Sequence, residues 1–226
     1  MKRLLTWEIL TVTVATMMLM TPFAITNKKI FVIGDSYSTF DEMGTYSEEF
    51  YYPFRSKGND VTEKSQTWRE VLAKKASMTV IGVDAYSGSS ITEREGDKTP
   101  SMVSRIKAAP EKHADIIIFM GGLNDAWQKI EIGSTDPKYA VESECDKFAP
   151  ALRYALRLLK EKNPNSKIIH SLIVYDRSVE AYQKAAETIC KEENVIFVPI
   201  SGMKCVSYHP TVKGMEQIAD ALLPYL

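Results

Sequence analysis

The sequence predicts a three-layer α/β protein, in which a flavodoxin-like, five-stranded parallel sheet carries helices on both faces. Two observations lead to this fold class. Short runs of β-branched and aromatic residues alternate along the chain with longer segments of helical periodicity. The most apolar of these runs show no strict alternation of apolar and polar residues, as is typical of strands buried on both faces. Alternating strand and helix patterns favour parallel strands, whose ligands bind beyond the carboxyl ends.

Five strands and five helices are expected in order along the chain. The most apolar strand follows Asp115 and reads Ile-Ile-Ile-Phe-Met, and two glycines end it. The longest helix has Leu152, Leu156 and Leu159 on one face and ends at the Asn163-Pro164 pair, because proline cannot continue a helix. The expected strands are residues 30–33, 78–83, 115–120, 167–174 and 195–199, and the expected helices are residues 66–77, 101–108, 140–162, 179–192 and 211–223.

The first residues of the chain have the pattern of a secretory signal peptide. Lys2 and Arg3 precede an apolar segment over residues 9–20, and Ala24 is a small residue suited to cleavage. The apolar segment is shorter than the roughly 20 residues that a membrane span needs. We therefore expect a signal peptide over residues 1–24, a single domain over residues 25–226 and export to the periplasm or the medium. The alternative is an uncleaved N-terminal anchor helix.

Composition excludes several classes of function. The formal net charge is only −1, so the chain lacks the basic stripe that nucleic-acid binding requires. The three cysteines and three histidines show no metal-ligand spacing, and we expect no metal. No P-loop or dinucleotide fingerprint is present, which argues against a cofactor and against a flavodoxin-like binding module. A disulfide between Cys190, at a helix end, and Cys205, in a nearby loop, remains an alternative, because the two residues are close in sequence.

The turn after the first strand is the strongest candidate site. Gly34 ends the strand, and Asp35 and Ser36 are both good helix N-caps, so Ser36 is expected where a strand tip meets a helix N-terminus. A main-chain N–H there is free to bind an anion. On this stretch alone the serine can be a cap or a nucleophile. Nucleophilic serine chemistry also needs a base and a further donor for the developing oxyanion.

Three more polar positions at the ends of elements supply these groups. Gly88 follows the second strand and allows a main-chain N–H to approach a ligand closely. Asn124 follows the third strand, and its uncharged amide N–H₂ suits an oxyanion. His209 lies in a loop just before the last helix. The carboxyl ends of parallel strands lie at one edge of the sheet, so a single crevice there can contain these residues.

These positions resemble the conserved blocks of the SGNH hydrolases, the GDSL-like esterases and lipases. The resemblance extends over nearly everything after residue 28. Its blocks are Gly34-Asp35-Ser36-Tyr37-Ser38, Gly88 in Ser87-Gly88-Ser89-Ser90, Gly121-Gly122-Leu123-Asn124-Asp125 and His209-Pro210. It implies that Ser36 is the nucleophile, that His209 is the base, and that Ser36, Gly88 and Asn124 form the oxyanion hole, with Asp35 bracing the turn. It also implies acyl transfer and makes O-acetyl groups on carbohydrates a reasonable substrate class.

Other activities stay open at this stage. Lysophospholipase and thioesterase activities belong to the same family, and nothing in the sequence reads as a long apolar lid or acyl tunnel. A non-catalytic carbohydrate-binding protein on a hydrolase scaffold is the alternative from another class. Tyr37 and Trp127 are close in sequence to the proposed catalytic groups and are candidates for an aromatic wall against a sugar ring. The aromatic segment 41–65 is expected to be an ordered loop, either over the mouth of the site or packed on the body of the domain.

One departure from the family pattern concerns the partner of the histidine. The usual last block has an aspartate three residues before the histidine, and here that position is Val206. A neutral imidazole needs a partner on Nδ1 to keep Nε2 free to accept a proton. We expect a main-chain carbonyl of the 203–208 loop to take this place, which predicts a Ser-His dyad. A distant carboxylate folded into the site is the alternative.

Overall fold

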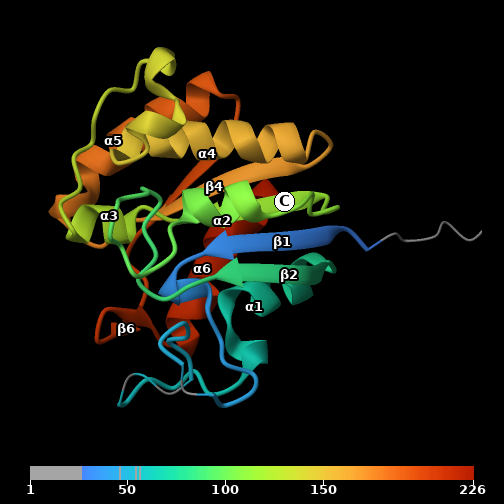
Figure 1. Cartoon of the computed structure of the whole chain (residues 1–226). Helices are drawn as coiled ribbons and strands as arrows, with labels where there is room; N and C mark the ends of the chain where they lie inside the picture. The colour runs from blue at the N-terminus through green and yellow to red at the C-terminus, as the bar shows by residue number, and fades with distance from the viewer. Residues whose placement is uncertain (1–26, 46, 54, 56) are drawn as a thin grey trace, which may run out of the picture.

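The computed structural model describes residues 27–45, 47–53, 55 and 57–226. The expected signal peptide lies outside these residues. Five parallel strands form one sheet in the order β2-β1-β3-β4-β5, which confirms the predicted fold class (Figure 1). The strands are β1 (Lys29–Gly34), β2 (Thr79–Ala85), β3 (Ile116–Met120), β4 (Lys167–Ile173) and β5 (Ile196–Ile200).

Helices cover both faces of the sheet (Figure 1). On one face α1 packs against α6, and on the other α4 packs against both α2 and α5. Trp68, Phe148 and Leu72 are fully buried between the helices and the sheet, so the apolar stripes predicted for these helices do face the core. The helices are α1 (Trp68–Ala76), α2 (Met102–Ala108), α3 (Leu123–Trp127), α4 (Phe148–Lys162), α5 (Glu180–Glu192) and α6 (Val212–Leu222).

Two elements differ from the sequence prediction. The helix expected over residues 140–162 begins only at Phe148, because Pro150 is tolerated in the first turn of a helix but not in its interior. Short 3₁₀ turns, Pro137–Tyr139 and Glu142–Glu144, precede it. The five-residue helix α3 was not predicted, since it is too short for a periodic pattern. It starts at Gly122, whose φ of 107° is a left-handed conformation that favours glycine.

A small antiparallel hairpin was also missed by the sequence analysis. Its strands are β6 (Cys205–Val206) and β7 (His209–Pro210), with Val206 opposite His209. Ser207 and Tyr208 form the turn and both have positive φ, 47° and 65°. Two-residue turns of this kind match the twist of a hairpin, but they are usually built from glycine or asparagine, so the Ser-Tyr pair gave no signal.

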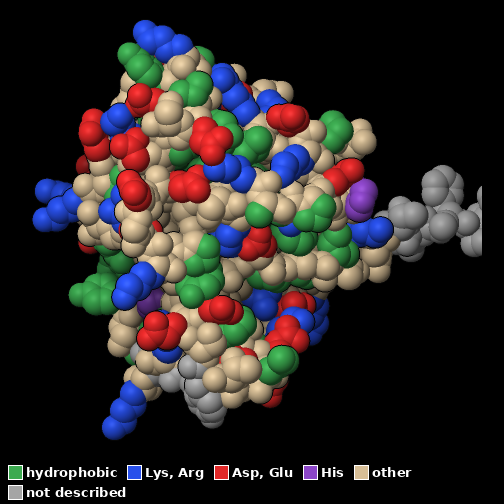
Figure 2. All heavy atoms as spheres, in the orientation of Figure 1, with side chains coloured by type: hydrophobic (Ala, Val, Ile, Leu, Met, Phe, Trp, Pro, Cys, Tyr) green, Lys and Arg blue, Asp and Glu red, His purple; other side chains and the backbone are tan. Residues whose placement is uncertain are grey.

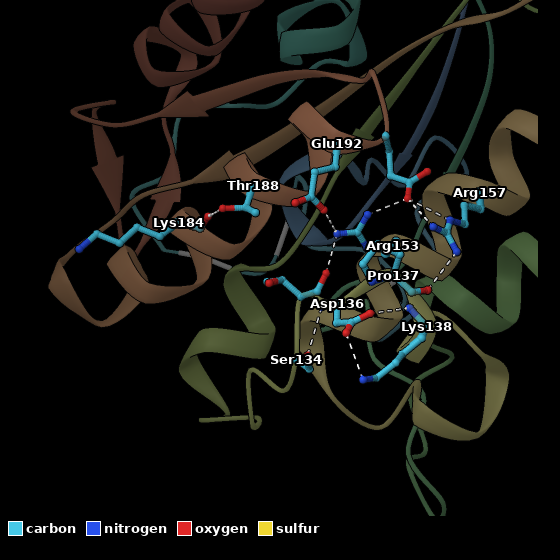
Figure 3. A network of polar contacts seen from close by, with 11 residues as sticks. Ser134, Asp136, Pro137, Lys138, Arg153, Arg157, Lys184, Thr188 and Glu192 are labelled. Atoms are coloured by element: carbon cyan, nitrogen blue, oxygen red, sulfur yellow. Dashed lines mark hydrogen bonds and ion pairs between the residues drawn. The ribbon is translucent and has the colours of Figure 1, made fainter.

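A buried arginine on α4, Arg153, joins this helix to the end of α5. Arg153 bonds the carboxylates of Glu192 and Glu193, the latter at 2.8 Å, and donates to the Thr135 carbonyl at 2.6 Å (Figure 3). Glu193 also accepts from Arg157. Every charge in this cluster has an opposite charge within hydrogen-bond distance, which is the condition under which a buried ion pair is tolerated.

The surface agrees with the near-neutral composition. On the face shown in Figure 2, Lys and Arg side chains are mixed with Asp and Glu, and no basic stripe is visible. Among the described residues, no helix is long and apolar enough to cross a membrane. The thiols of Cys145, Cys190 and Cys205 are all free, so the disulfide considered for Cys190 and Cys205 is not formed.

Candidate active site

Ser36 lies where the sequence predicted it, at the turn that follows β1. The chain leaves Gly34 and enters a single 3₁₀ turn, Ser36–Ser38, whose N-cap is Asp35. The Asp35 carboxylate accepts a hydrogen bond from the Tyr37 N–H at 3.0 Å, and it is buried. Burial raises the pKa of Asp35 to about 7, although the nearby Arg105 charge opposes this shift. Asp35 thus holds the backbone of the turn that presents Ser36.

The His209 ring points at the Ser36 hydroxyl. The hairpin brings Nε2 to 2.9 Å from Ser36 Oγ, across 173 positions of sequence. On the other side of the ring, Nδ1 lies 3.1 Å from the Ser207 carbonyl oxygen. A carbonyl can only accept, so Nδ1 carries the proton and the lone pair of Nε2 faces the hydroxyl. This is the arrangement that a general base requires.

The partner of Nδ1 is thus a main-chain carbonyl. It belongs to the 203–208 loop, as the sequence analysis expected. Within the described residues, no carboxylate oxygen hydrogen-bonds to His209. Burial lowers the pKa of His209 to about 4; the Ser207 carbonyl acts in the opposite direction, and the Arg55 charge adds to the lowering. The imidazole is therefore neutral at pH 7 and free to accept a proton.

Side-chain hydroxyls from distant segments hold the hairpin in place. The Tyr37 hydroxyl donates to the Tyr208 carbonyl, and the Tyr52 hydroxyl donates to the Pro210 carbonyl at 2.8 Å. Asn59 Nδ2 also donates to Pro210, at 3.0 Å. Part of the aromatic 41–65 segment thus packs on the body of the domain, with Tyr52 fully buried. Its neighbour Tyr51 stacks on the His209 ring, so the segment also contacts the residue expected to be the base.

Gly88 lies on a turn and Asn124 on α3, and a hydrogen bond joins these two segments. Asn124 Nδ2 donates one hydrogen to the Ser89 carbonyl at 2.9 Å, next to Gly88, and its amide has a second hydrogen to donate. Gly88 has a φ of +80°, a conformation that favours glycine, and it is exposed at the surface. This bond connects two of the positions to which the sequence analysis assigned oxyanion donors.

Two charged residues, the buried Asp125 and the partly buried Arg105, organise these segments, and the sequence analysis missed both. The Asp125 carboxylate accepts from the N–H groups of Ile91 and Thr92, at 2.8 and 3.1 Å, and so ties α3 to the loop after Gly88. Burial raises the pKa of Asp125, and these main-chain donors counteract the shift. The only signal was the position of Asp125 beside Asn124, which did not distinguish the two residues.

Arg105, on α2, links the turn of Ser36 with the turn of Gly88. Its guanidinium donates to the Gly34 carbonyl at 2.9 Å and to Ser89 Oγ at 3.2 Å. It also bonds both the carbonyl and the carboxylate of Asp84. Arg105 therefore fixes the ends of β1 and β2 relative to each other. In sequence it appears only as one charged residue of a helix, with its partners 16 to 71 residues away.

The two candidates for an aromatic wall differ in exposure: Trp127 lies at the surface, and Tyr37 is buried and has no ring face open to a ligand. Trp127 is 37% exposed, whereas Tyr37 is 1% exposed, because its hydroxyl is drawn inward to the Tyr208 carbonyl. Trp127 forms an exposed aromatic trio with Tyr175 and Tyr208, at ring-centroid distances of 5.4 to 6.1 Å. Tyr208 directly precedes His209, so one ring of the trio belongs to the hairpin that carries His209.

Sequence comparison identifies the family of the chain. The family model for the GDSL-like lipases and acylhydrolases matches residues 28–226. The chain belongs to this family. Its members are typically ester hydrolases, and the coarse assignment of the chain is therefore a GDSL-like hydrolase. A search of curated proteins found no match.

Solved structures agree with the family assignment. A protein from Bacteroides uniformis described as a GDSL-like lipase has a TM-score of 0.76 and 26% identity, covering 88% of this chain and 95% of its own. A similarly described protein from Bacteroides ovatus has a TM-score of 0.75 and 25% identity, with coverages of 88% and 98%. A family two carbohydrate esterase from Clostridium thermocellum shares the fold at 14% identity and a TM-score of 0.61, covering 87% of this chain and 62% of its own.

Proposed function

We propose that the GDSL-like hydrolase is a serine esterase in which Ser36 and His209 act as a dyad. The observation that carries this proposal is the 2.9 Å separation between His209 Nε2 and Ser36 Oγ, with Nδ1 occupied by a carbonyl. The hydroxyl and the base are thus in contact, and the tautomer leaves Nε2 available. Nucleophile activation by an adjacent base requires this geometry.

The reaction follows from these positions. Ser36 Oγ attacks the ester carbonyl carbon while its proton passes to His209 Nε2, and the carbonyl oxygen becomes an oxyanion. The N–H groups of Ser36 and Gly88 and the amide of Asn124 stabilise that negative charge. The tetrahedral intermediate collapses, the C–O bond to the alcohol breaks, and His209 returns the proton to the leaving oxygen. Water then attacks the acyl-serine by the same steps, with His209 as base, and releases the carboxylic acid and free Ser36.

The substrate we propose is a short acyl ester, such as an O-acetyl group, on a carbohydrate. The support is the trio of exposed aromatic rings, Trp127, Tyr175 and Tyr208, which offers an apolar surface beside His209 for the face of a sugar ring. We also propose that the chain is exported and that residues 1–24 are removed. Mass spectrometry of the protein recovered from outside the cells that produce it shows directly whether residues 1–24 have been removed.

Hydrolysis of p-nitrophenyl acetate by the purified chain tests the catalytic proposal. We expect turnover by the wild type and none above background for Ser36→Ala, whose circular dichroism and melting temperature stay the same because the side chain is small and at a turn. Turnover of Ser36→Ala within a few-fold of the wild type would refute the assignment. Absence of turnover by both, with sugar binding retained, would instead support a non-catalytic carbohydrate-binding protein.

Two further experiments refine the proposal. Acetyl, butyryl and octanoyl esters of p-nitrophenol rank the acyl length, and a preference for octanoyl would favour a lysophospholipase or thioesterase. Trp127→Ala should raise KM several-fold for an acetylated sugar and leave KM for p-nitrophenyl acetate unchanged. Equal effects on both substrates would argue that the Trp127 ring is structural.

A further inference from the structure

His209 is held without a carboxylate, yet its ring is closely surrounded. Nε2 faces Ser36, Nδ1 faces the Ser207 carbonyl, and the rings of Tyr37 and Tyr52 lie tilted or edge-on at centroid distances of 5.1 and 6.3 Å. The fifth neighbour is Tyr51, whose ring is parallel to the imidazole within 7° at a centroid distance of 3.3 Å.

We propose that Tyr51 is a positioning residue whose ring face stabilises the protonated His209 that forms when Ser36 gives up its proton. The inference rests on the proposed function of the dyad. Two neutral aromatic rings prefer offset or edge-to-face contacts to a face-to-face stack. A cation over a tyrosine face is instead attracted to the negative face of the ring. The stack therefore becomes more favourable when His209 is an imidazolium, which is the condition for lowering a reaction barrier.

The position of Tyr51 is set from the nucleophile itself. Its N–H donates to Thr39 Oγ1 at 2.9 Å, and the same hydroxyl donates to the Ser36 carbonyl at 2.9 Å. The next residue, Tyr52, accepts from the Asp41 N–H at 2.8 Å and is buried. The loop that carries the stacked ring is therefore bonded to the turn that carries Ser36, and the ring and the hydroxyl keep a fixed relation around His209.

Charge makes such a ring useful at this site. The charged group that acts on His209 is Arg55, whose N–H donates to the Tyr51 carbonyl at 3.0 Å and whose guanidinium lies 3.5 Å from Ser87 Oγ. A positive charge there opposes protonation of the imidazole. A triad aspartate would offset this opposition, and Val206 cannot. Besides the Ser207 carbonyl at Nδ1, the Tyr51 face is a group in contact with the ring that favours the cation.

Replacing the ring while keeping apolar cover tests this role. In Tyr51→Leu we expect kcat for p-nitrophenyl acetate to fall roughly three- to tenfold, which converts to about 0.6–1.4 kcal/mol of barrier and lies within the range of a cation–π contact. In Tyr51→Phe, which keeps the π face and removes only the hydroxyl, kcat should stay within twofold. Tyr139→Leu, at a partly exposed tyrosine of another loop, serves as a control for removing a tyrosine, and its kcat should not change.

The protonation of His209 gives a readout that does not need turnover. We expect the NMR titration of His209, assigned by its loss in His209→Gln, to move to lower pH by about 0.5–1 unit in Tyr51→Leu and to stay unchanged in Tyr51→Phe. An unchanged or raised His209 pKa in Tyr51→Leu would overturn the inference, and so would a loss in Tyr51→Phe equal to that in Tyr51→Leu. If the wild type had no esterase activity, the function would fail, while the titration would still decide the role of the stack.

Discussion

His170 and His209 have the same kind of partner on Nδ1, and they differ in exposure and in what faces Nε2. His170 lies on β4 in the core, with Nδ1 3.0 Å from the Phe119 carbonyl, and His209 has Nδ1 3.1 Å from the Ser207 carbonyl. Burial lowers the pKa of each to about 4. His170 Nε2 is buried between the rings of Phe119 and Phe197 and has no hydrogen-bond partner in the described part of the chain, whereas His209 Nε2 meets a hydroxyl.

The pair teaches that a lowered pKa and a fixed tautomer do not by themselves make a histidine a candidate base. Both residues have these properties, and only His209 has a serine hydroxyl at Nε2 and partial exposure to solvent. A perturbed pKa marks burial as readily as it marks function. The contact at Nε2 and the access to solvent decide which histidine is a candidate base, and both depend on the tertiary fold.

The largest expected effect separates the two histidines directly. His209→Gln should lower kcat for p-nitrophenyl acetate by roughly 10² to 10⁴, the range attributed to a general base. Glutamine is close in size to histidine and does not accept a proton at neutral pH. Steady-state kinetics on the folded variant, checked by circular dichroism, measure this. A loss of less than tenfold would mean that His209 is no more a base than His170.

The next effect tests whether the Ser36–His209 contact works together with an oxyanion donor. Asn124→Ala should lower kcat by roughly 10² to 10³, with a smaller change in KM, as for the loss of one oxyanion-hole donor. The bond from Asn124 to the Ser89 carbonyl is lost as well, so the melting temperature is measured in parallel. A lower melting temperature with an unchanged kcat per folded molecule would show that Asn124 is structural.

A smaller effect is expected from giving His209 the carboxylate that both histidines lack. Val206 lies opposite His209 in the hairpin, where cross-strand side chains are neighbours. Val206→Asp should therefore raise kcat several-fold, because a charge-assisted bond to Nδ1 is roughly twice as strong as a neutral one. The acid limb of kcat/KM should move to higher pH at the same time. A folded variant with no gain would mean that the loop cannot aim the carboxylate or that the carbonyl already suffices.

The smallest effect on activity is expected at His170. His170→Leu should leave kcat within twofold and change the pH dependence of stability. The folded pKa of about 4 lies below the unfolded value of 6.5, so the unfolded chain binds more protons between these values. His170 therefore costs stability progressively as pH falls from 6.5 to 4, by up to about 3 kcal/mol. Urea unfolding at pH 7 and pH 5 should show a smaller loss for the leucine variant, and an equal loss would contradict the buried, neutral assignment.

The sequence allowed the fold class and the positions of the strand ends to be predicted, because buried parallel strands and amphipathic helices leave local patterns. The positions Ser36, Gly88, Asn124 and His209 each follow such an element or precede one, and their blocks resemble those of a family. These residues could therefore be named in advance, although their catalytic roles stay predictions.

The rest depends on contacts that no local pattern encodes. Arg105 reaches Gly34 across 71 residues, and the inward hydroxyl bond that buries Tyr37 spans 171 residues. The β6-β7 hairpin is two residues long on each side and lacks the usual turn residues. The stack of Tyr51 on His209 joins an aperiodic loop to that hairpin. Each of these features follows from tertiary packing.

The carbonyl at Nδ1 also has a consequence for how such proteins are found and how they diverge. A main-chain oxygen belongs to every residue type, so the partner of His209 survives substitutions of Ser207 that tolerate its left-handed φ of 47°, above all glycine and asparagine. Position 206 is then released from any requirement to be acidic and can drift with the needs of the hairpin. A search pattern that demands an aspartate three residues before the histidine would discard chains built this way, while a pattern that asks for the turn geometry would retain them.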